Sequence, residues 1–79
     1  MDVKEKIIAL LNDKLGYEEA ELSEDKDLVN DLGIDSLDMV EIIMGIEEKF
    51  GLKIEDSEVA GIKTVGDLIR KAEELTQNK

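Results

Sequence analysis

The 79-residue sequence predicts an all-α fold, a small four-helix bundle with three main helices and one short helix. Three observations predict it. Apolar residues recur at helical three- and four-residue spacing in three separate segments. Strand-like alternation is confined to Leu52-Lys53-Ile54, which is too short for a sheet. A chain of this length also buries only about 60% of its unfolded surface, so we expect one small core and a single domain over residues 1–79.

The first main helix is expected over residues 3–15, because Gly16 follows its last apolar residue and can adopt the left-handed conformation that ends helices. The second is expected over residues 36–50. Asp35 and Ser36 offer short polar side chains to its first free N–H groups, and Gly51 follows its end.

The second half of the chain predicts one short helix and one longer helix. Asp56-Ser57 can cap a short helical turn through Val59 and Ala60, which Gly61 would end. Thr64-Val65-Gly66-Asp67 resembles a capping box, and it opens the last helix, expected over residues 68–75.

Residues 17–35 form a connection longer than the roughly 12–15 residues at which structureless loops become uncommon. We therefore expect an ordered crossover between the first two helices. Five apolar side chains can dock it on the bundle: Leu22, Leu28, Val29, Leu32 and Ile34.

The composition excludes several classes of function. The chain has no Cys and no His, which removes thiolate nucleophiles, the commonest general base and the commonest metal ligand, and we expect no metal site. A net charge of −11 argues against nucleic-acid binding, which relies on Lys and Arg.

No stretch approaches the roughly 18 apolar residues of a membrane span, and no targeting segment is evident. We expect a monomer in the cytoplasm with basic protein partners.

The negative charge is concentrated in the middle of the chain. Residues 16–60 carry 15 acidic and three basic residues, a net charge of −12. No basic residue falls between Asp27 and Glu48. Such a field steers a positively charged surface toward one face, although acidic residues can also serve only to keep a small protein soluble. The segregation favours a docking role.

The helix over residues 36–50 carries two apolar stripes. One is expected to face the core and contains Met39, Ile42, Ile43, Ile46 and Phe50. The other contains Leu37, Val40 and Met44, and it is flanked by Glu41, Glu47 and Glu48. This second stripe either packs on a second neighbour or forms an exposed seam for a partner. Gly45 falls on the polar side, so Gly45→Ala is expected to stabilise the helix by up to about 1 kcal/mol unless a partner needs close approach there.

Ser36 stands where helix N–H groups and the macrodipole favour an anion. It is a poor nucleophile, because no His can activate it and the nearby ionisable groups are carboxylates. Either Asp35 or Ser36 can be a plain N-cap. The functional alternative is an attachment point for a phosphodiester, with Leu37 contacting the enzyme that delivers the group.

These residues resemble the acyl carrier proteins, whose hallmark is an Asp-Ser-Leu modified with phosphopantetheine. The match includes Asp35, Ser36, Leu37 and Asp38 and continues through Val40-Glu41, the segment 47–51 and the segment 64–68. It covers essentially the whole chain, which looks most like the free-standing carriers of bacterial-type fatty acid synthesis. Glu55 stands where many relatives have Pro, and Gly61 falls in the short helix, so that segment is expected to be looser than usual.

The resemblance implies that a phosphopantetheinyl transferase uses coenzyme A and Mg²⁺ to attach 4′-phosphopantetheine to Ser36. The thiol of that arm carries acyl chains as thioesters, and the protein itself catalyses nothing. Fatty acid synthesis enzymes would use their own basic patches to dock onto six residues of this helix: Leu37, Val40, Glu41, Met44, Glu47 and Glu48. We expect acyl chains to fold into a pocket lined by Met39, Ile43, Ile46, Ile54, Val59, Ile62 and Leu68.

Two other interpretations stay open from the sequence. The same acidic helix suits an unmodified adaptor that binds basic proteins. A carboxylate-pair hydrolase is a more distant alternative, because so short a bundle has little room for a concave site.

Overall fold

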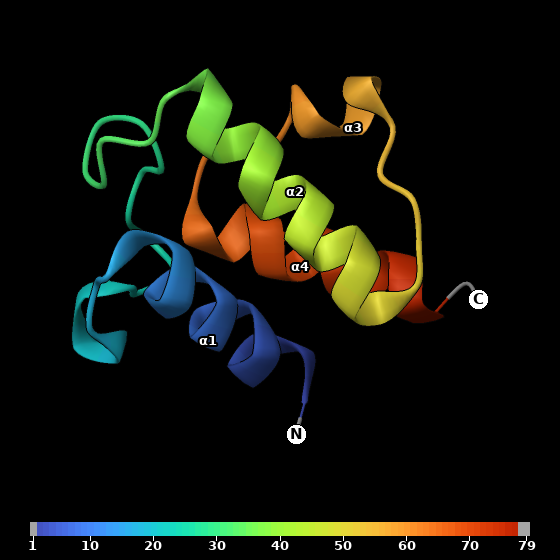
Figure 1. The fold of residues 1–79 in the computed structure, drawn as a ribbon, viewed down its shortest axis with the longest axis horizontal. Helices are drawn as coiled ribbons and strands as arrows, with labels where there is room; N and C mark the ends of the chain where they lie inside the picture. Colours follow the sequence, from blue (N-terminus) through green and yellow to red (C-terminus); the bar gives the residue numbers. More distant parts are fainter. Residues whose placement is uncertain (1, 78–79) are drawn as a thin grey trace.

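The computed structural model describes residues 2–77 and shows a helical bundle (Figure 1). Its elements in order are α1 (Val3–Leu15), the 3-10 helix η1 (Glu19–Glu21), α2 (Ser36–Phe50), α3 (Asp56–Val59) and α4 (Val65–Gln77). The described residues contain no strand, and their one β-bridge pairs Asp27 with Thr64. The predicted all-α class, with three main helices, one short helix and an ordered crossover, is confirmed.

The two helices of the first half have the predicted bounds, and local chemistry explains their ends. Asp2 caps α1 by accepting a hydrogen bond from the Glu5 N–H at 2.8 Å. Gly16 at φ 77° and Gly51 at φ 65° follow α1 and α2 in the left-handed region. Glycine adopts this conformation without the steric cost that a β-carbon imposes, so both helices end where the sequence predicts.

The two helices of the second half differ from expectation. Glu55, not Asp56 or Ser57, is the N-cap of α3, and Glu58 Oε2 accepts a hydrogen bond from the Glu55 N–H at 3.2 Å. Gly61 does not end α3 through a left-handed conformation, because its φ is not positive. The last helix is longer than residues 68–75, since it begins directly after Thr64 and continues to Gln77.

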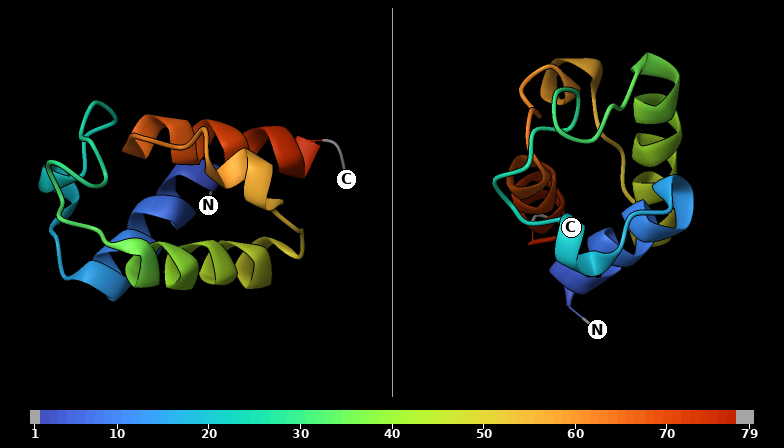
Figure 2. Two further views of the ribbon diagram at one scale, coloured as in Figure 1. Left: turned by 90° about the horizontal axis from the view of Figure 1, so that it is seen from above. Right: turned by 90° about the vertical axis from the view of Figure 1, so that its left-hand side faces the viewer.

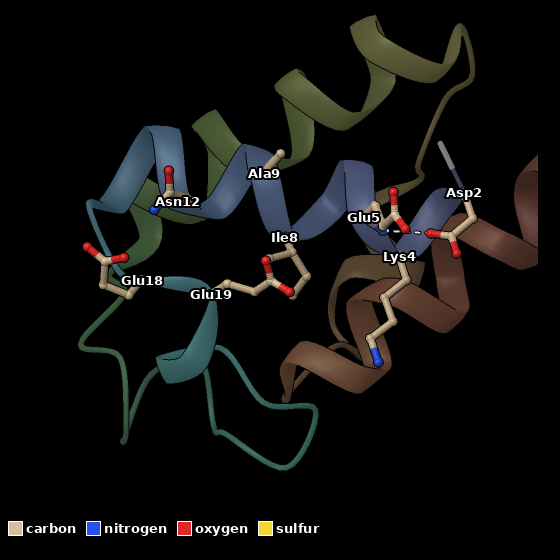
Figure 3. Close-up of a pocket in the computed structure, with 8 residues that line it drawn as sticks. All are labelled: Asp2, Lys4, Glu5, Ile8, Ala9, Asn12, Glu18 and Glu19. Atoms are coloured by element: carbon tan, nitrogen blue, oxygen red, sulfur yellow. Dashed lines mark hydrogen bonds between the residues drawn. The ribbon is translucent and has the colours of Figure 1, made fainter.

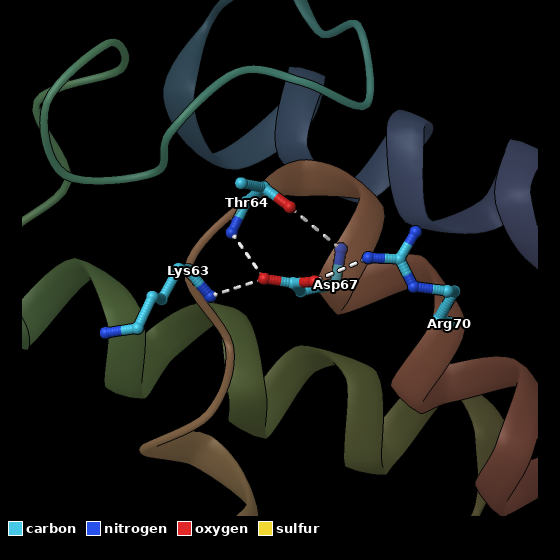
Figure 4. Close-up of polar contacts among 4 residues, drawn as sticks. All are labelled: Lys63, Thr64, Asp67 and Arg70. Carbon is cyan, nitrogen blue, oxygen red and sulfur yellow. Dashed lines mark hydrogen bonds and ion pairs between the residues drawn. The ribbon is translucent and has the colours of Figure 1, made fainter.

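The predicted capping box before α4 is present (Figure 4). Thr64 Oγ1 accepts from the Asp67 N–H at 3.1 Å, while Asp67 Oδ2 accepts from the Thr64 N–H at 3.2 Å and the Lys63 N–H at 3.1 Å. Arg70 forms an ion pair with the same carboxylate. These backbone bonds, above all the one from Lys63, lower the pKa of Asp67.

The crossover is ordered and anchored, with one correction. Leu22, Leu28, Leu32 and Ile34 are buried, whereas Val29 is 64% exposed and does not dock on the bundle. Main-chain bonds also attach the segment to the entrance of α4: the Leu28 N–H donates to Lys63 O at 2.9 Å, and the Val65 N–H donates to Lys26 O at 3.0 Å. This pairing with a distant segment could not be read from the local pattern.

The four α-helices surround one core. In two perpendicular views α2 and α4 lie on opposing sides, α1 closes one end between them, and α3 lies at the other end (Figure 2). Helix α1 packs on both α2 and α4. The core consists of aliphatic side chains from all parts of the described chain: Ile7, Ile8, Leu10, Leu11, Leu22, Leu28, Leu32, Ile34, Ile42, Ile43, Ile46, Ile54, Ile62, Val65, Leu68, Ile69 and Ala72. No helix among the described residues is long and apolar enough to cross a membrane.

Gly45 does not lie on the polar side of α2 as the helical pattern suggested. It is half-buried and faces α1, where a β-carbon at this position would lie 3.1 Å from Leu10 Cδ1. The predicted position of Gly45 was therefore wrong, and helix propensity alone does not decide the effect of alanine at this position.

Candidate functional site: the N-terminus of α2 and the groove beside it

Ser36 is the first residue of α2, and its hydroxyl is free for chemistry. Asp35 is the N-cap: its Oδ1 accepts from the Asp38 N–H at 2.9 Å, and Asp38 Oδ2 accepts from the Asp35 N–H at 3.4 Å. Ser36 is exposed, and its hydroxyl makes no hydrogen bond to any other described residue. Because Asp35 does the capping, the serine is not required for it.

The turn before α2 is fixed by its own side chains. Asp27 Oδ1 accepts from the Val29 and Asn30 N–H groups at 3.0 and 2.8 Å, and Asp31 Oδ2 accepts from the Asp27 N–H at 2.7 Å. Gly33 adopts the left-handed conformation at φ 66°, and buried Ile34 follows it. The start of α2 is thus held by a buried anchor immediately before Asp35 and Ser36.

A groove of about 500 Å³ runs from Ser36 along α2 toward α3. Four of the seven residues predicted for an acyl pocket line it: Met39, Ile43, Ile54 and Val59. The other three, Ile46, Ile62 and Leu68, are buried in the core and do not reach its wall. Helical periodicity identified the inward stripe of α2 but could not separate the residues that fill the core from those that border a cavity.

The groove also has lining residues that the pocket prediction missed: Ser36, Val40, Met44, Glu47, Lys53 and Asp56. Val40, Met44 and Glu47 were predicted only as partner contacts. Nothing in the sequence marked Lys53 or Asp56 as a groove residue, since exposed charged side chains are ordinarily solvated.

The second stripe of α2 is an exposed apolar row. Leu37, Val40 and Met44 are 76%, 54% and 60% exposed. Glu41 and Glu48 are exposed as well. Glu47 differs, because it is half-buried and its Oε2 accepts a hydrogen bond from the Ile54 N–H at 2.8 Å. An apolar row beside carboxylates is the form expected of a surface that a basic protein covers.

A second hollow is lined by residues from the first part of the chain, between α1 and η1 (Figure 3). It measures about 710 Å³ and is lined largely by polar and charged residues, among them Glu5, Asn12 and Glu18. Lys4 at its rim pairs with Glu24 at 3.0 Å, and this hydrogen-bonded pairing raises the pKa of Lys4. None of the residues predicted for the functional site lines this hollow.

The residues around Ser36 fit a phosphopantetheine arm. The hydroxyl is exposed, the helix N-terminus beside it favours an anionic phosphodiester, and an apolar groove begins at the same residue.

Within residues 2–77 no three His, Cys, Asp or Glu side chains are grouped so as to hold a metal ion.

Comparisons with known proteins agree with this geometry. The family model for the phosphopantetheine attachment site matches residues 5–71. An acyl carrier protein from Thermotoga maritima is 38% identical over 68 residues, covering 86% of this chain and 84% of that protein. A solved structure of an acyl carrier protein from Mycobacterium tuberculosis superimposes with a TM-score of 0.86 at 30% identity, over 92% of this chain and 97% of the other. This chain belongs to the acyl carrier protein family and carries a covalently attached 4′-phosphopantetheine group.

Proposed function

We propose that this protein is a free-standing carrier of fatty acid synthesis that holds growing acyl chains as thioesters on an arm attached to Ser36. The observation that carries the proposal is the position of the Ser36 hydroxyl. It is exposed at the start of α2, is not used for capping, and lies at the mouth of an apolar groove.

The chain's own residues have simple tasks in this function. Asp35 and Asp38 hold the first turn of α2, so that the Ser36 oxygen can attack the β-phosphate of coenzyme A on a transferase that uses Mg²⁺. The diphosphate bond breaks, the phosphopantetheinyl group stays on Ser36, 3′,5′-ADP leaves, and the serine proton passes to a base of the transferase. The attached arm supplies a terminal thiol, which this Cys-free chain lacks. The protein catalyses no reaction itself.

The groove is the proposed place for the acyl chain. Met39, Ile43, Ile54 and Val59 provide its apolar lining between α2 and α3. Burial in this groove would contribute at most about 0.8 kcal/mol for each methylene. Ile46, Ile62 and Leu68, which were predicted to line it, belong to the core instead.

Successive enzymes are proposed to dock on Leu37, Val40, Glu41, Met44, Glu47 and Glu48. The exposed apolar row gives them a surface to bury, and the flanking acids select partners with Lys and Arg patches. The transferase would use the same surface, since Leu37 adjoins Ser36. In this proposal the carrier is a cytoplasmic monomer with one acyl-carrier domain over residues 1–79.

Intact mass spectrometry tests the attachment. Incubation of the purified protein with coenzyme A, Mg²⁺ and a phosphopantetheinyl transferase should add one phosphopantetheinyl group. Ser36→Ala should abolish the addition, while Ser57→Ala, which removes another exposed serine, should not. An unmodified wild-type protein that still binds basic proteins would instead support the adaptor interpretation.

A further inference from the structure

Glu47 holds the chain that follows α2 at three points. Its backbone oxygen accepts from the Gly51 N–H and from the Leu52 N–H, the latter at 3.1 Å. Its side-chain Oε2 accepts from the Ile54 N–H at 2.8 Å. One residue of the helix therefore satisfies three of the first four backbone donors after Phe50.

The third of these bonds bears on the groove. Ile54 is only 5% exposed and lines the groove opposite α2, with Lys53 beside it. Its N–H has no other hydrogen-bond acceptor among the described residues. A part-buried N–H that loses an ionised acceptor must find water, and the segment that carries it is then free to shift.

The neighbouring acid provides a contrast. Glu48 is exposed, and its side chain makes no hydrogen bond within residues 2–77, whereas Glu47 is half-buried and itself lines the groove. Both carry one negative charge on the last turns of α2. Comparison of the two therefore controls for the charge of the helix, and Glu47→Gln, which keeps the size and an acceptor oxygen, controls for the loss of side-chain volume.

We propose that Glu47 is a positioning residue for the acyl groove: its carboxylate fixes the Ile54 wall and so sets how well the groove shields a bound acyl thioester. This inference rests on the proposed acyl-carrying function. It adds to the docking role of Glu47 a second role that Glu48 does not share.

Amide hydrogen exchange at Ile54, followed by NMR on the protein before arm attachment, tests the bond itself. Glu47→Ala should accelerate this exchange by about tenfold or more, because hydrogen bonds to charged acceptors are strong. Glu47→Gln keeps an acceptor oxygen and should restore most of the protection. Glu48→Ala should leave Ile54 unchanged.

Cleavage by hydroxylamine, measured on the octanoyl thioester of the same variants, tests shielding. Glu47→Ala should be cleaved several-fold faster than wild type, with Glu48→Ala and Glu47→Gln close to wild type. If Glu47→Ala does not fold, Glu47→Met, which is similar in size and also lacks an acceptor oxygen, is used in both measurements.

Equal cleavage rates for Glu47→Ala and Glu48→Ala would overturn the proposal, as would unchanged Ile54 exchange in Glu47→Ala. The exchange measurement needs no prosthetic group. It therefore separates failure of this inference from failure of the proposed carrier function, which would appear as a missing mass addition on the wild-type protein.

Discussion

Gly45 of α2 lies directly against Leu10 of α1: a β-carbon at position 45 would be 3.1 Å from Leu10 Cδ1 and 3.3 Å from Cδ2. Both contacts are closer than ordinary van der Waals distance, so the buried Leu10 side chain would have to shift to accommodate a β-carbon. The glycine thus serves the contact between two helices rather than the solvent face of one.

We expect Gly45→Ala to change the free energy of unfolding by less than about 0.5 kcal/mol, because the gain in helix propensity of about 1 kcal/mol is opposed by the displaced leucine. In a Leu10→Ala background the same substitution should stabilise by about 1 kcal/mol. Urea unfolding of the four proteins measures the coupling. Equal stabilisation by Gly45→Ala in both backgrounds would show that the two residues do not interact.

Asp67 should make stability depend on acidic pH. Its pKa is lowered in the folded protein, first by the Lys63 N–H, from an unfolded value of about 3.9. Its contribution is therefore fully present above about pH 4 and is lost as the pH falls through the lower folded pKa. Asp67→Asn should cost about 1 kcal/mol at neutral pH, and the difference from wild type should shrink below about pH 4. Urea midpoints from pH 7 to pH 2 measure it, and a constant difference would contradict this account.

Substitutions at Met44 and Ile46 should separate effects on enzyme docking from effects on the stability of the fold. Met44 is 60% exposed, whereas Ile46 is fully buried. Met44→Ala should change the free energy of unfolding by less than about 0.5 kcal/mol yet lower kcat/KM for arm attachment by a transferase several-fold. Ile46→Ala should cost about 2–5 kcal/mol. Thermal melts and intact-mass time courses provide the two readouts, and an unaltered attachment rate in Met44→Ala would remove Met44 from the docking surface.

Loading with longer acyl chains should raise the melting temperature until the groove is full, because each added methylene leaves water. Val59→Trp places a ring in the groove and should flatten this dependence. Val29→Trp is the matched control, since Val29 is exposed on the crossover and does not line the groove. A melting temperature indifferent to chain length in the wild-type protein would argue against burial of the chain.

The bounds of α1 and α2 follow from chemistry within a few residues of each end. Asp2 and Asp35 cap the starts, and Gly16 and Gly51 take the left-handed conformation after the ends. Such signals act locally, so the two glycine ends could be predicted without knowledge of the fold, and Asp35 was one of two candidate caps for α2; the Asp2 cap was not predicted. The box between Thr64 and Asp67 is of the same kind.

Other features depend on which segments meet in space. Val29 shares the apolar character of its buried neighbours in the crossover, but its side chain remains exposed while theirs reach the core. Ile46 and Ile43 lie on one stripe of α2, yet only Ile43 borders the groove that α2 forms with α3 and residues 53–54. The spacing of apolar residues predicts which side of a helix is buried, but not which segment of the chain packs against it.

The sequence by itself determined the helical class, the extents of α1 and α2, the acidic middle of the chain and the serine at the start of α2, since each depends on neighbouring residues or on composition. Only the tertiary structure decided that Gly45 meets Leu10, that Glu47 holds Ile54, and that four of the predicted pocket residues border a cavity while three fill the core. These are contacts between segments separated along the chain, and packing of the whole bundle sets them.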